Sequence, residues 1–126
     1  MGVRVLVVED EQPLGELIQE VLERAGLEAH WVPDGLQARD LLDQCEYDLI
    51  LMDIIFTRTG GLDLIEWVRE RNVEIPIIAM TGYGPETARE ALNAGATDAI
   101  LKPFELAQLE ELLSRYLPVG KPEDKV

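Results

Sequence analysis

Cysteine and long apolar runs are nearly absent from this sequence. Cys45 is the single cysteine among 126 residues, which excludes an internal disulfide framework and favours a reducing cytoplasm. No apolar run reaches the ~20 residues that a helix needs to cross a bilayer. The N-terminal residues also lack the regions of a secretory signal peptide. We therefore expect a soluble cytoplasmic protein that makes no use of a membrane.

Basic residues are scarce as well. The chain has 25 acidic residues and 11 Lys or Arg residues, for a formal net charge of −14. A protein that binds the phosphates of nucleic acids needs clustered Lys and Arg side chains. The composition therefore argues against direct nucleic-acid binding and favours proteins or cations as partners.

The length and the apolar content predict one domain. A chain of 126 residues with 47% hydrophobic residues can bury a substantial core. We assign residues 1–118 to this domain. Residues 119–126 are short, polar and charged, which predicts a flexible C-terminal tail or the truncated start of a linker to an output domain.

Five short apolar segments alternate with five segments of helical period. The predicted strands are residues 3–8, 28–32, 48–52, 75–80 and 98–101. This alternation is typical of an α/β protein with helices on both faces of a parallel sheet. The first, third and fourth strands are apolar throughout, which predicts that they are the central strands.

Proline, glycine and apolar spacing mark the helices. The first helix should begin near Pro13 and stop at Gly26, a residue suited to a left-handed C-cap. The fourth should begin at Pro85 and end before Gly95. The other three show apolar side chains at helical spacing. These are Leu41, Leu42 and Cys45 in the second helix, Leu62, Ile65 and Val68 in the third, and Leu106, Leu109, Leu113 and Tyr116 in the last.

Polar side chains stand at the ends of four of the five predicted strands. Glu9 and Asp10 follow the first strand, and Asp53 follows the third. Thr81 follows the fourth strand and Lys102 the fifth. Because ligands of such sheets bind at the carboxyl ends of the strands, we expect these side chains to meet at one edge of the sheet.

The expected cluster suits a divalent cation and a phosphoryl group. Neighbouring carboxylates repel one another, and a hard cation such as Mg²⁺ (or Mn²⁺) commonly neutralises them. Asp10 and Asp53 would hold the cation with Glu9 nearby. Lys102 and the Thr81 hydroxyl would contact phosphoryl oxygens. Asp53 is then the nucleophile, and its product is an acyl phosphate.

These residues resemble the receiver domains of bacterial two-component response regulators over residues 4–117. The segments that carry the resemblance are Val7-Val-Glu-Asp10, Leu51-Met-Asp53, Gly61, Met80-Thr-Gly82 and Leu101-Lys-Pro-Phe104. The resemblance implies a flavodoxin-like doubly wound (βα)5 fold with strand order 2-1-3-4-5. It also implies a phosphorelay in which a histidine kinase or a histidine phosphotransfer protein donates the phosphoryl group to Asp53.

The resemblance has further implications for the site. It implies that the backbone carbonyl of Ile55 is a metal ligand and that the bond between Lys102 and Pro103 is cis. It also implies that the face formed by the fourth helix, fifth strand and fifth helix binds a downstream protein, an output domain or a second copy of the chain as a homodimer.

Two positions depart from the pattern of the family. Thr57 stands where a proline is usual, and Ala99 stands where a Tyr or Phe is usual, three residues before the lysine. The absence of this aromatic side chain argues against the usual aromatic switch. We therefore expect Thr81 and Tyr83 to act as the switching residues.

Other functions fit the sequence less well. A phosphohydrolase of the haloacid dehalogenase type also uses a strand-end Asp, Mg²⁺, a Thr or Ser and a Lys. It needs a second Asp two residues after the nucleophile, where this chain has Ile55, which cannot transfer protons. A degenerate receiver that only binds partners would lack Asp53, Lys102 or the acidic pair. In the plainest alternative, Glu9, Asp10 and Glu11 are solvated charges of a loop or a helix start.

Overall fold

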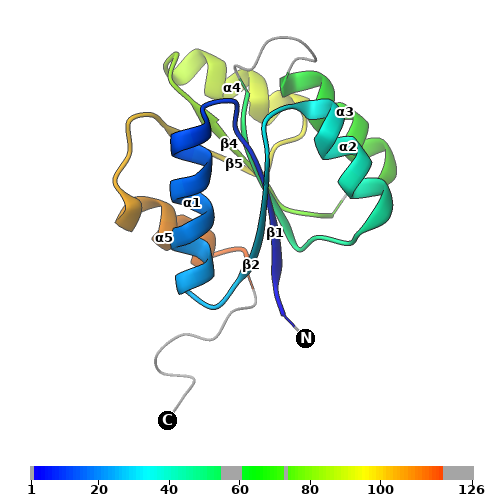
Figure 1. Cartoon of the computed structure of the whole chain (residues 1–126). Helices are drawn as coiled ribbons and strands as arrows, with labels where there is room; N and C mark the ends of the chain where they lie inside the picture. Colours follow the sequence, from blue (N-terminus) through cyan, green and yellow to red (C-terminus); the bar gives the residue numbers. More distant parts are fainter. Residues whose placement is uncertain (1, 55–60, 73, 118–126) are drawn as a thin grey trace.

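Five strands alternate with five helices in the described part of the chain, which comprises residues 2–54, 61–72 and 74–117 of a computed structural model. Figure 1 shows the elements in the colours of the sequence. In chain order they are β1 (Arg4–Val8), α1 (Gln12–Arg24), β2 (Glu28–Val32), α2 (Gly35–Gln44), β3 (Leu49–Asp53), α3 (Gly61–Arg71), β4 (Ile77–Thr81), α4 (Pro85–Ala94), β5 (Asp98–Leu101) and α5 (Leu106–Ser114).

The five strands form one parallel sheet in the order β2-β1-β3-β4-β5. The predicted fold class and strand order are confirmed. Every residue of β3 and of β4 is buried, whereas the edge strands β2 and β5 are partly exposed. The three strands with uninterrupted apolar sequences are therefore the central ones, as expected for strands covered on both faces.

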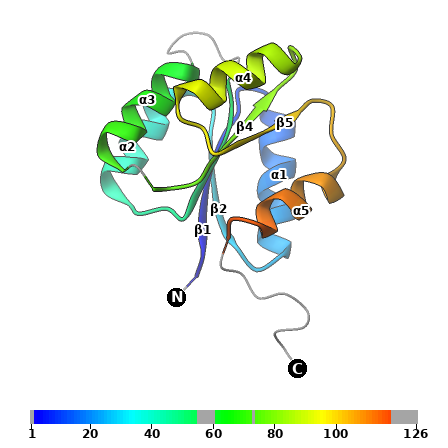
Figure 2. The same cartoon turned by 180° about the vertical axis from the view of Figure 1, so that it is seen from behind.

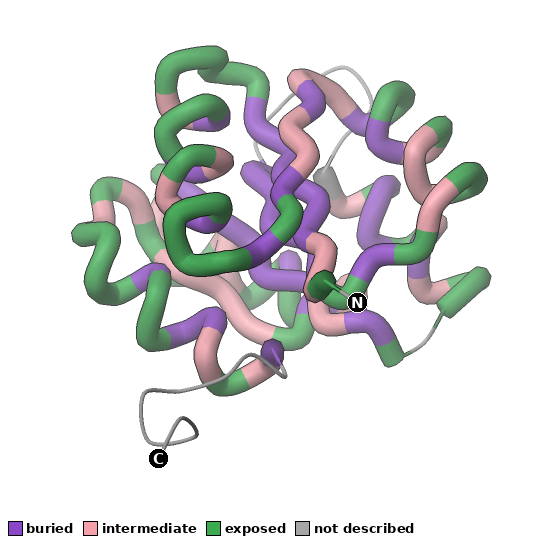
Figure 3. Tube along the Cα trace, turned by 60° about the horizontal axis from the view of Figure 1, so that its bottom comes forward, coloured by how far each residue is buried: buried purple, intermediate pink, exposed green. Residues whose placement is uncertain are grey.

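Helices cover both faces of the sheet. α1 and α5 lie on one face, and α2, α3 and α4 lie on the other (Figures 1 and 2). Successive strand side chains point to opposite faces. Val5 and Val7 of β1 therefore pack with Ile18 of α1, whereas Leu6 packs with Leu64 of α3. The purple segments in Figure 3 show that burial is concentrated between these layers.

The predicted boundaries hold to within about two residues. Leu27 donates its backbone N–H to the Leu22 carbonyl at 3.0 Å, and Gly26 donates to Glu23 at 3.0 Å with a φ of +92°. This is a Schellman C-cap at the predicted end of α1. β4 begins at Ile77 rather than at residue 75, because Pro76 has no N–H to donate to a ladder.

Some predicted features lie outside the described residues. These are Ile55, Thr57 and the C-terminal segment 119–126. None of the helices formed by the described residues is long and apolar enough to cross a membrane.

Arg69 of α3 donates hydrogen bonds to the end of α4, to the residue that follows α3 and to the loop before β5. Its Nε donates to the Gly95 carbonyl at the end of α4, at 2.7 Å. Its Nη1 donates to the Asn72 carbonyl at 3.1 Å, and its Nη2 donates to the Thr97 hydroxyl at 3.2 Å. A cation at the C-terminal end of a helix also interacts favourably with the helix dipole. Arg69 therefore holds α4 and the loop before β5 against α3.

We expect Arg69→Ala to lower the free energy of unfolding by about 1–3 kcal/mol, because the variant removes the donor of the partly buried Gly95 carbonyl and of two exposed acceptors. Urea denaturation measures the change. Arg24→Ala is a matched control, since its pair with Glu20 lies on an exposed helix surface and should contribute less than about 0.5 kcal/mol. Equal losses in the two variants would contradict the role of Arg69.

Candidate functional site

The carboxyl edge of the sheet, at the top of Figure 1, gathers the predicted site residues. Glu9 follows β1, Asp53 is the last residue of β3, and Thr81 is the last residue of β4. Lys102 follows β5. Glu9 and Thr81 are fully buried, Asp53 is 6% exposed, and Asp10 is exposed. The buried groups face inward at the edge, whereas Asp10 is open to solvent.

Backbone pairing places these residues. The Lys102 N–H donates to the Thr81 carbonyl at 2.7 Å, and the Glu9 N–H donates to the Val32 carbonyl at 3.1 Å. On β3 and β4, Asp53 pairs in register with Met80. Backbone pairing therefore holds Glu9, Asp53, Thr81 and Lys102, whereas Asp10 lies in the bend that leads into α1.

The Lys102 ammonium joins two carboxylates from distant parts of the chain. Its Nζ lies 2.7 Å from Oδ2 of Asp53 and 2.9 Å from Oε1 of Glu9. Burial alone would lower the pKa of Lys102, but the hydrogen bonds to Asp53 and Glu9 outweigh this effect and raise the pKa above its usual value. Lys102 therefore carries a fixed positive charge beside Asp53.

Glu9 is a buried acid with an unusual affinity for a proton. Loss of solvation raises the pKa of its carboxyl to about 7, although the hydrogen bonds from Lys102 and from the Glu11 N–H act in the opposite direction. The negative charge of Asp53 raises the pKa further. Burial therefore disfavours the charged form of Glu9 more than its hydrogen bonds favour it.

The arrangement of acids fits a divalent cation. Glu9, Asp10 and Asp53 each offer a carboxylate oxygen, and these oxygens lie within 4.8 Å of one another. With all three ionised and Lys102 protonated, two net negative charges remain. An all-oxygen set of this kind suits Mg²⁺ or Mn²⁺. The proposed carbonyl ligand, Ile55, is not among the described residues.

Thr81 connects the site to the loop that leads into α4. Its Oγ1 accepts a hydrogen bond from the Tyr83 N–H at 3.1 Å, and the Thr87 hydroxyl donates to the Tyr83 carbonyl at 3.3 Å. The Tyr83 side chain is 69% exposed. Ala99 of β5 pairs with Ala79 and is partly buried. The peptide bond between Lys102 and Pro103 is cis.

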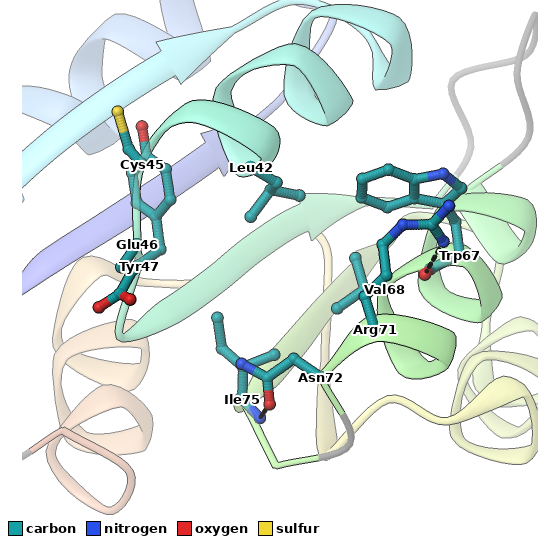
Figure 4. A pocket seen from close by; sticks show the side chains of 9 residues that line it. All are labelled: Leu42, Cys45, Glu46, Tyr47, Trp67, Val68, Arg71, Asn72 and Ile75. Carbon is teal, nitrogen blue, oxygen red and sulfur yellow. Dashed lines mark hydrogen bonds between the residues drawn. The ribbon is translucent and has the colours of Figure 1, made fainter.

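A second concavity, of about 320 Å³, lies at the opposite edge of the sheet, between α2 and α3 (Figure 4). Arg71 stacks over the Trp67 ring at 3.9 Å and donates to the Trp67 carbonyl at 2.9 Å. Oδ1 of Asn72 accepts from the N–H groups of Glu74 and Ile75. These polar side chains have local partners, and the pocket is remote from the strand ends that carry the acids.

Trp31 of β2 also lies at the carboxyl edge of the sheet, a location that the sequence pattern does not predict. Its indole Nε1 donates to the backbone carbonyl of Glu9 at 2.8 Å. The parallel pairing of β2 with β1, which aligns Trp31 with Val7, brings the indole beside the acidic pair.

Comparisons with known proteins agree with this geometry. Residues 5–114 match the response regulator receiver domain family. The response regulator protein PilR of Pseudomonas aeruginosa is 36% identical over 121 residues, which cover 95% of this chain and 27% of PilR. The response regulator RppA of Synechocystis is 39% identical over 126 residues, with 95% of this chain and 54% of RppA covered.

Solved structures show the same fold. The Vibrio cholerae chemotaxis protein CheY4 superimposes with a TM-score of 0.86 and 28% identity, over 93% of this chain and 100% of CheY4. NtrX from Brucella abortus superimposes with a TM-score of 0.87 and 31% identity, over 93% of this chain and 27% of NtrX. The chain thus spans about a quarter to a half of the length of several relatives that it matches. It belongs to the family of response regulator receiver domains, which are phosphoacceptor switches of two-component signalling.

Proposed function

We propose that this chain accepts a phosphoryl group on Asp53 from a phosphohistidine donor in a phosphorelay, with Mg²⁺ or Mn²⁺ bound by Glu9, Asp10, Asp53 and the carbonyl of Ile55. The observation that supports this proposal most strongly is the pair of contacts from Lys102 to Asp53 and Glu9. They place the positive charge of the Lys102 ammonium beside the carboxylate that would receive the phosphoryl group.

The proposed reaction is a displacement at phosphorus. An oxygen of the Asp53 carboxylate forms a bond to phosphorus while the bond from phosphorus to the donor imidazole nitrogen breaks. The imidazole leaves with the electron pair of that bond and takes up a proton from solvent. Lys102 and the Thr81 hydroxyl contact the transferred oxygens. When bound, the divalent cation supplies further positive charge to the phosphoryl group. Later hydrolysis of the acyl phosphate returns the carboxylate.

A small phosphodonor distinguishes a receiver from a phosphohydrolase. We expect acetyl phosphate with Mg²⁺ to add one phosphoryl group per chain, followed by slow release of phosphate. A phosphohydrolase would instead release phosphate continuously from a generic phosphomonoester. Intact-mass spectrometry and a phosphate-release assay measure the two behaviours. Steady turnover without a phosphorylated species would contradict the receiver assignment.

The protein donor, a histidine kinase or a histidine phosphotransfer protein, needs a surface beside Asp53. A groove of about 520 Å³ runs between α1 and the segment that joins β5 to α5. Leu14, Leu17, Phe104 and Leu106 give it an apolar lining, and Lys102 connects it to the site. We place the donor on this groove because Lys102, one of its lining residues, contacts the Asp53 carboxylate. We also propose that the phosphoryl transfer takes place in the cytoplasm.

The proposed switch runs from Thr81 to Tyr83. If the Thr81 hydroxyl turns toward a phosphoryl oxygen on Asp53, its hydrogen bond with the Tyr83 N–H changes. Gly84, with a φ of +91°, follows Tyr83 and can absorb backbone rotation. One hydrogen bond contributes only about 0.5–1.5 kcal/mol, so we expect a partial shift in population.

The output face of the proposed switch consists of α4, β5 and α5. Leu92 of α4 and Leu101 of β5 are exposed there, and Ala99 leaves β5 without an aromatic side chain at that position. Exposed apolar side chains at an edge strand suit a protein partner. We propose that a downstream protein, an output domain or a second copy of the chain docks on this face.

Amide NMR with beryllofluoride, a mimic of the phosphoryl group, tests this switch. We expect the signals of residues 81–86 to shift in the wild-type protein. The shift of Tyr83 should be much smaller in Thr81→Val, which lacks the hydroxyl. Thr87→Val is a control, because its hydroxyl contacts the Tyr83 carbonyl and not the phosphoacceptor. Small changes in residues 81–86 beside large changes elsewhere on the output face would exclude Tyr83 as the relay.

A further inference from the structure

The geometry points to Trp31 as a positioning residue for the cation site. We infer that its indole N–H, by holding the peptide group between Glu9 and Asp10, sets the direction in which the two acids meet the cation. This inference rests on the proposed function, because it concerns the affinity of the same site for Mg²⁺. It adds a residue of the edge strand β2 that contributes no metal ligand of its own.

Two bonds from the end of β2 hold Glu9. The Trp31 indole Nε1 donates to the Glu9 carbonyl at 2.8 Å, and the Val32 carbonyl accepts from the Glu9 N–H at 3.1 Å. The first bond fixes the peptide group that follows Glu9, and the second fixes the one that precedes it. Both peptide planes on either side of a buried acid are therefore anchored to the neighbouring strand.

Gly15 of α1 makes room for the indole. A Cβ atom at Gly15 would lie 2.1 Å from Nε1 and 2.4 Å from Cδ1 of Trp31, far inside contact distance. The ring therefore lies directly against the helix backbone, where only a glycine fits. The Gly15 N–H donates to the Glu11 carbonyl at 2.9 Å, in the first turn of α1. Trp31 thus packs between that turn and the acidic pair.

Asp10 depends on this anchoring more than Glu9 does. Glu9 is also held through its side chain, by Lys102 and by the Glu11 N–H. Asp10 is exposed, and within the residues that the structure describes its carboxylate forms no hydrogen bond or ion pair. Its position relative to Asp53 therefore follows from the backbone that Trp31 orients. Groups that orient metal ligands in this way commonly change metal affinity by about ten- to a hundredfold.

Two variants test the inference. Trp31→Phe keeps an aromatic ring and removes the N–H donor. Gly15→Ala keeps the indole but displaces it from its place against α1. We expect both to bind Mg²⁺ roughly tenfold more weakly than the wild type in isothermal titration calorimetry. Trp67→Phe is the matched control, because Trp67 lies on α3 and lines the pocket at the opposite edge. Its Mg²⁺ affinity should equal that of the wild type.

The dependence of phosphorylation on Mg²⁺ separates positioning from a loss of stability. We expect the rate with acetyl phosphate to fall in Trp31→Phe at low Mg²⁺ and to recover at saturating Mg²⁺. Thermal unfolding identifies which variants are folded. A folded Trp31→Phe or Gly15→Ala variant that binds Mg²⁺ within twofold of the wild type would overturn the inference. A wild-type protein that binds no Mg²⁺ would instead overturn the proposed function.

Discussion

Asp53→Asn should remain folded and should accept no phosphoryl group from acetyl phosphate and Mg²⁺. The substitution removes the nucleophilic carboxylate and keeps the shape of the side chain. An Asn oxygen can still accept a hydrogen bond from Lys102, and Glu9 stays in place as the second partner of the ammonium. The partly buried ammonium of Lys102 therefore keeps two partners, whereas an unpaired charge at this place would be destabilising. Intact-mass spectrometry measures the loss of labelling, and circular dichroism follows the fold.

Asp40→Asn provides the control for this loss. Asp40 is an exposed residue of α2, away from the strand ends, and the variant should be labelled as fully as the wild type. Peptide mapping of the wild-type protein should place the phosphoryl group on Asp53. A full phosphoryl addition to Asp53→Asn would show that another residue is the acceptor and would remove the central proposal.

The sheet could be predicted because its strands carry their own signal. Leu51 and Ile78 belong to runs that are apolar at every position, and only a strand covered on both faces needs such a run. The edge strands were identified with the help of their place in the alternation, since Glu28 and Asp98 begin them with charges. The strand order itself came from the family resemblance, because local sequence does not specify which strands pair.

The acids and the lysine could be predicted from one topological rule. Parallel strands end at a shared edge, so Asp53 and Lys102 are predicted to lie at the same edge of the sheet. Which oxygens the ammonium contacts could not be predicted. Lys102 stands on a flexible four-carbon stem, and its choice of Asp53 and Glu9 depends on distances that only the assembled sheet defines.

Trp31 could not be found in the same way. A tryptophan in a strand ordinarily packs in a core, and its hydrogen bond goes to a backbone carbonyl, which has no signature in the sequence. The missing Cβ of Gly15 provides the space, but a glycine inside a helical pattern normally indicates only a weaker helix. Trp31 and Gly15 come into contact only when α1 packs on β2.

Removal of the divalent cation should suppress phosphorylation of the wild-type protein by at least about a hundredfold, since a bound metal ion stabilises transition-state charge by several kcal/mol. Excess EDTA provides the test, and renewed Mg²⁺ should restore labelling.

Loss of a metal ligand should have a smaller effect of the same kind. We expect Asp10→Asn to lower the labelling rate at least about tenfold at limiting Mg²⁺, because one carboxylate of the cluster is lost.

More Mg²⁺ should partly rescue Asp10→Asn, because the weakened site still contains Glu9 and Asp53. No such rescue should be seen in Asp53→Asn, which lacks the nucleophile itself. Asp43→Asn, on the exposed surface of α2, should respond to EDTA and Mg²⁺ like the wild type. Rates from intact-mass time courses across a Mg²⁺ titration separate these cases. Unchanged labelling in excess chelator would contradict the cation site, because Lys102 alone would then suffice to neutralise the incoming phosphoryl group.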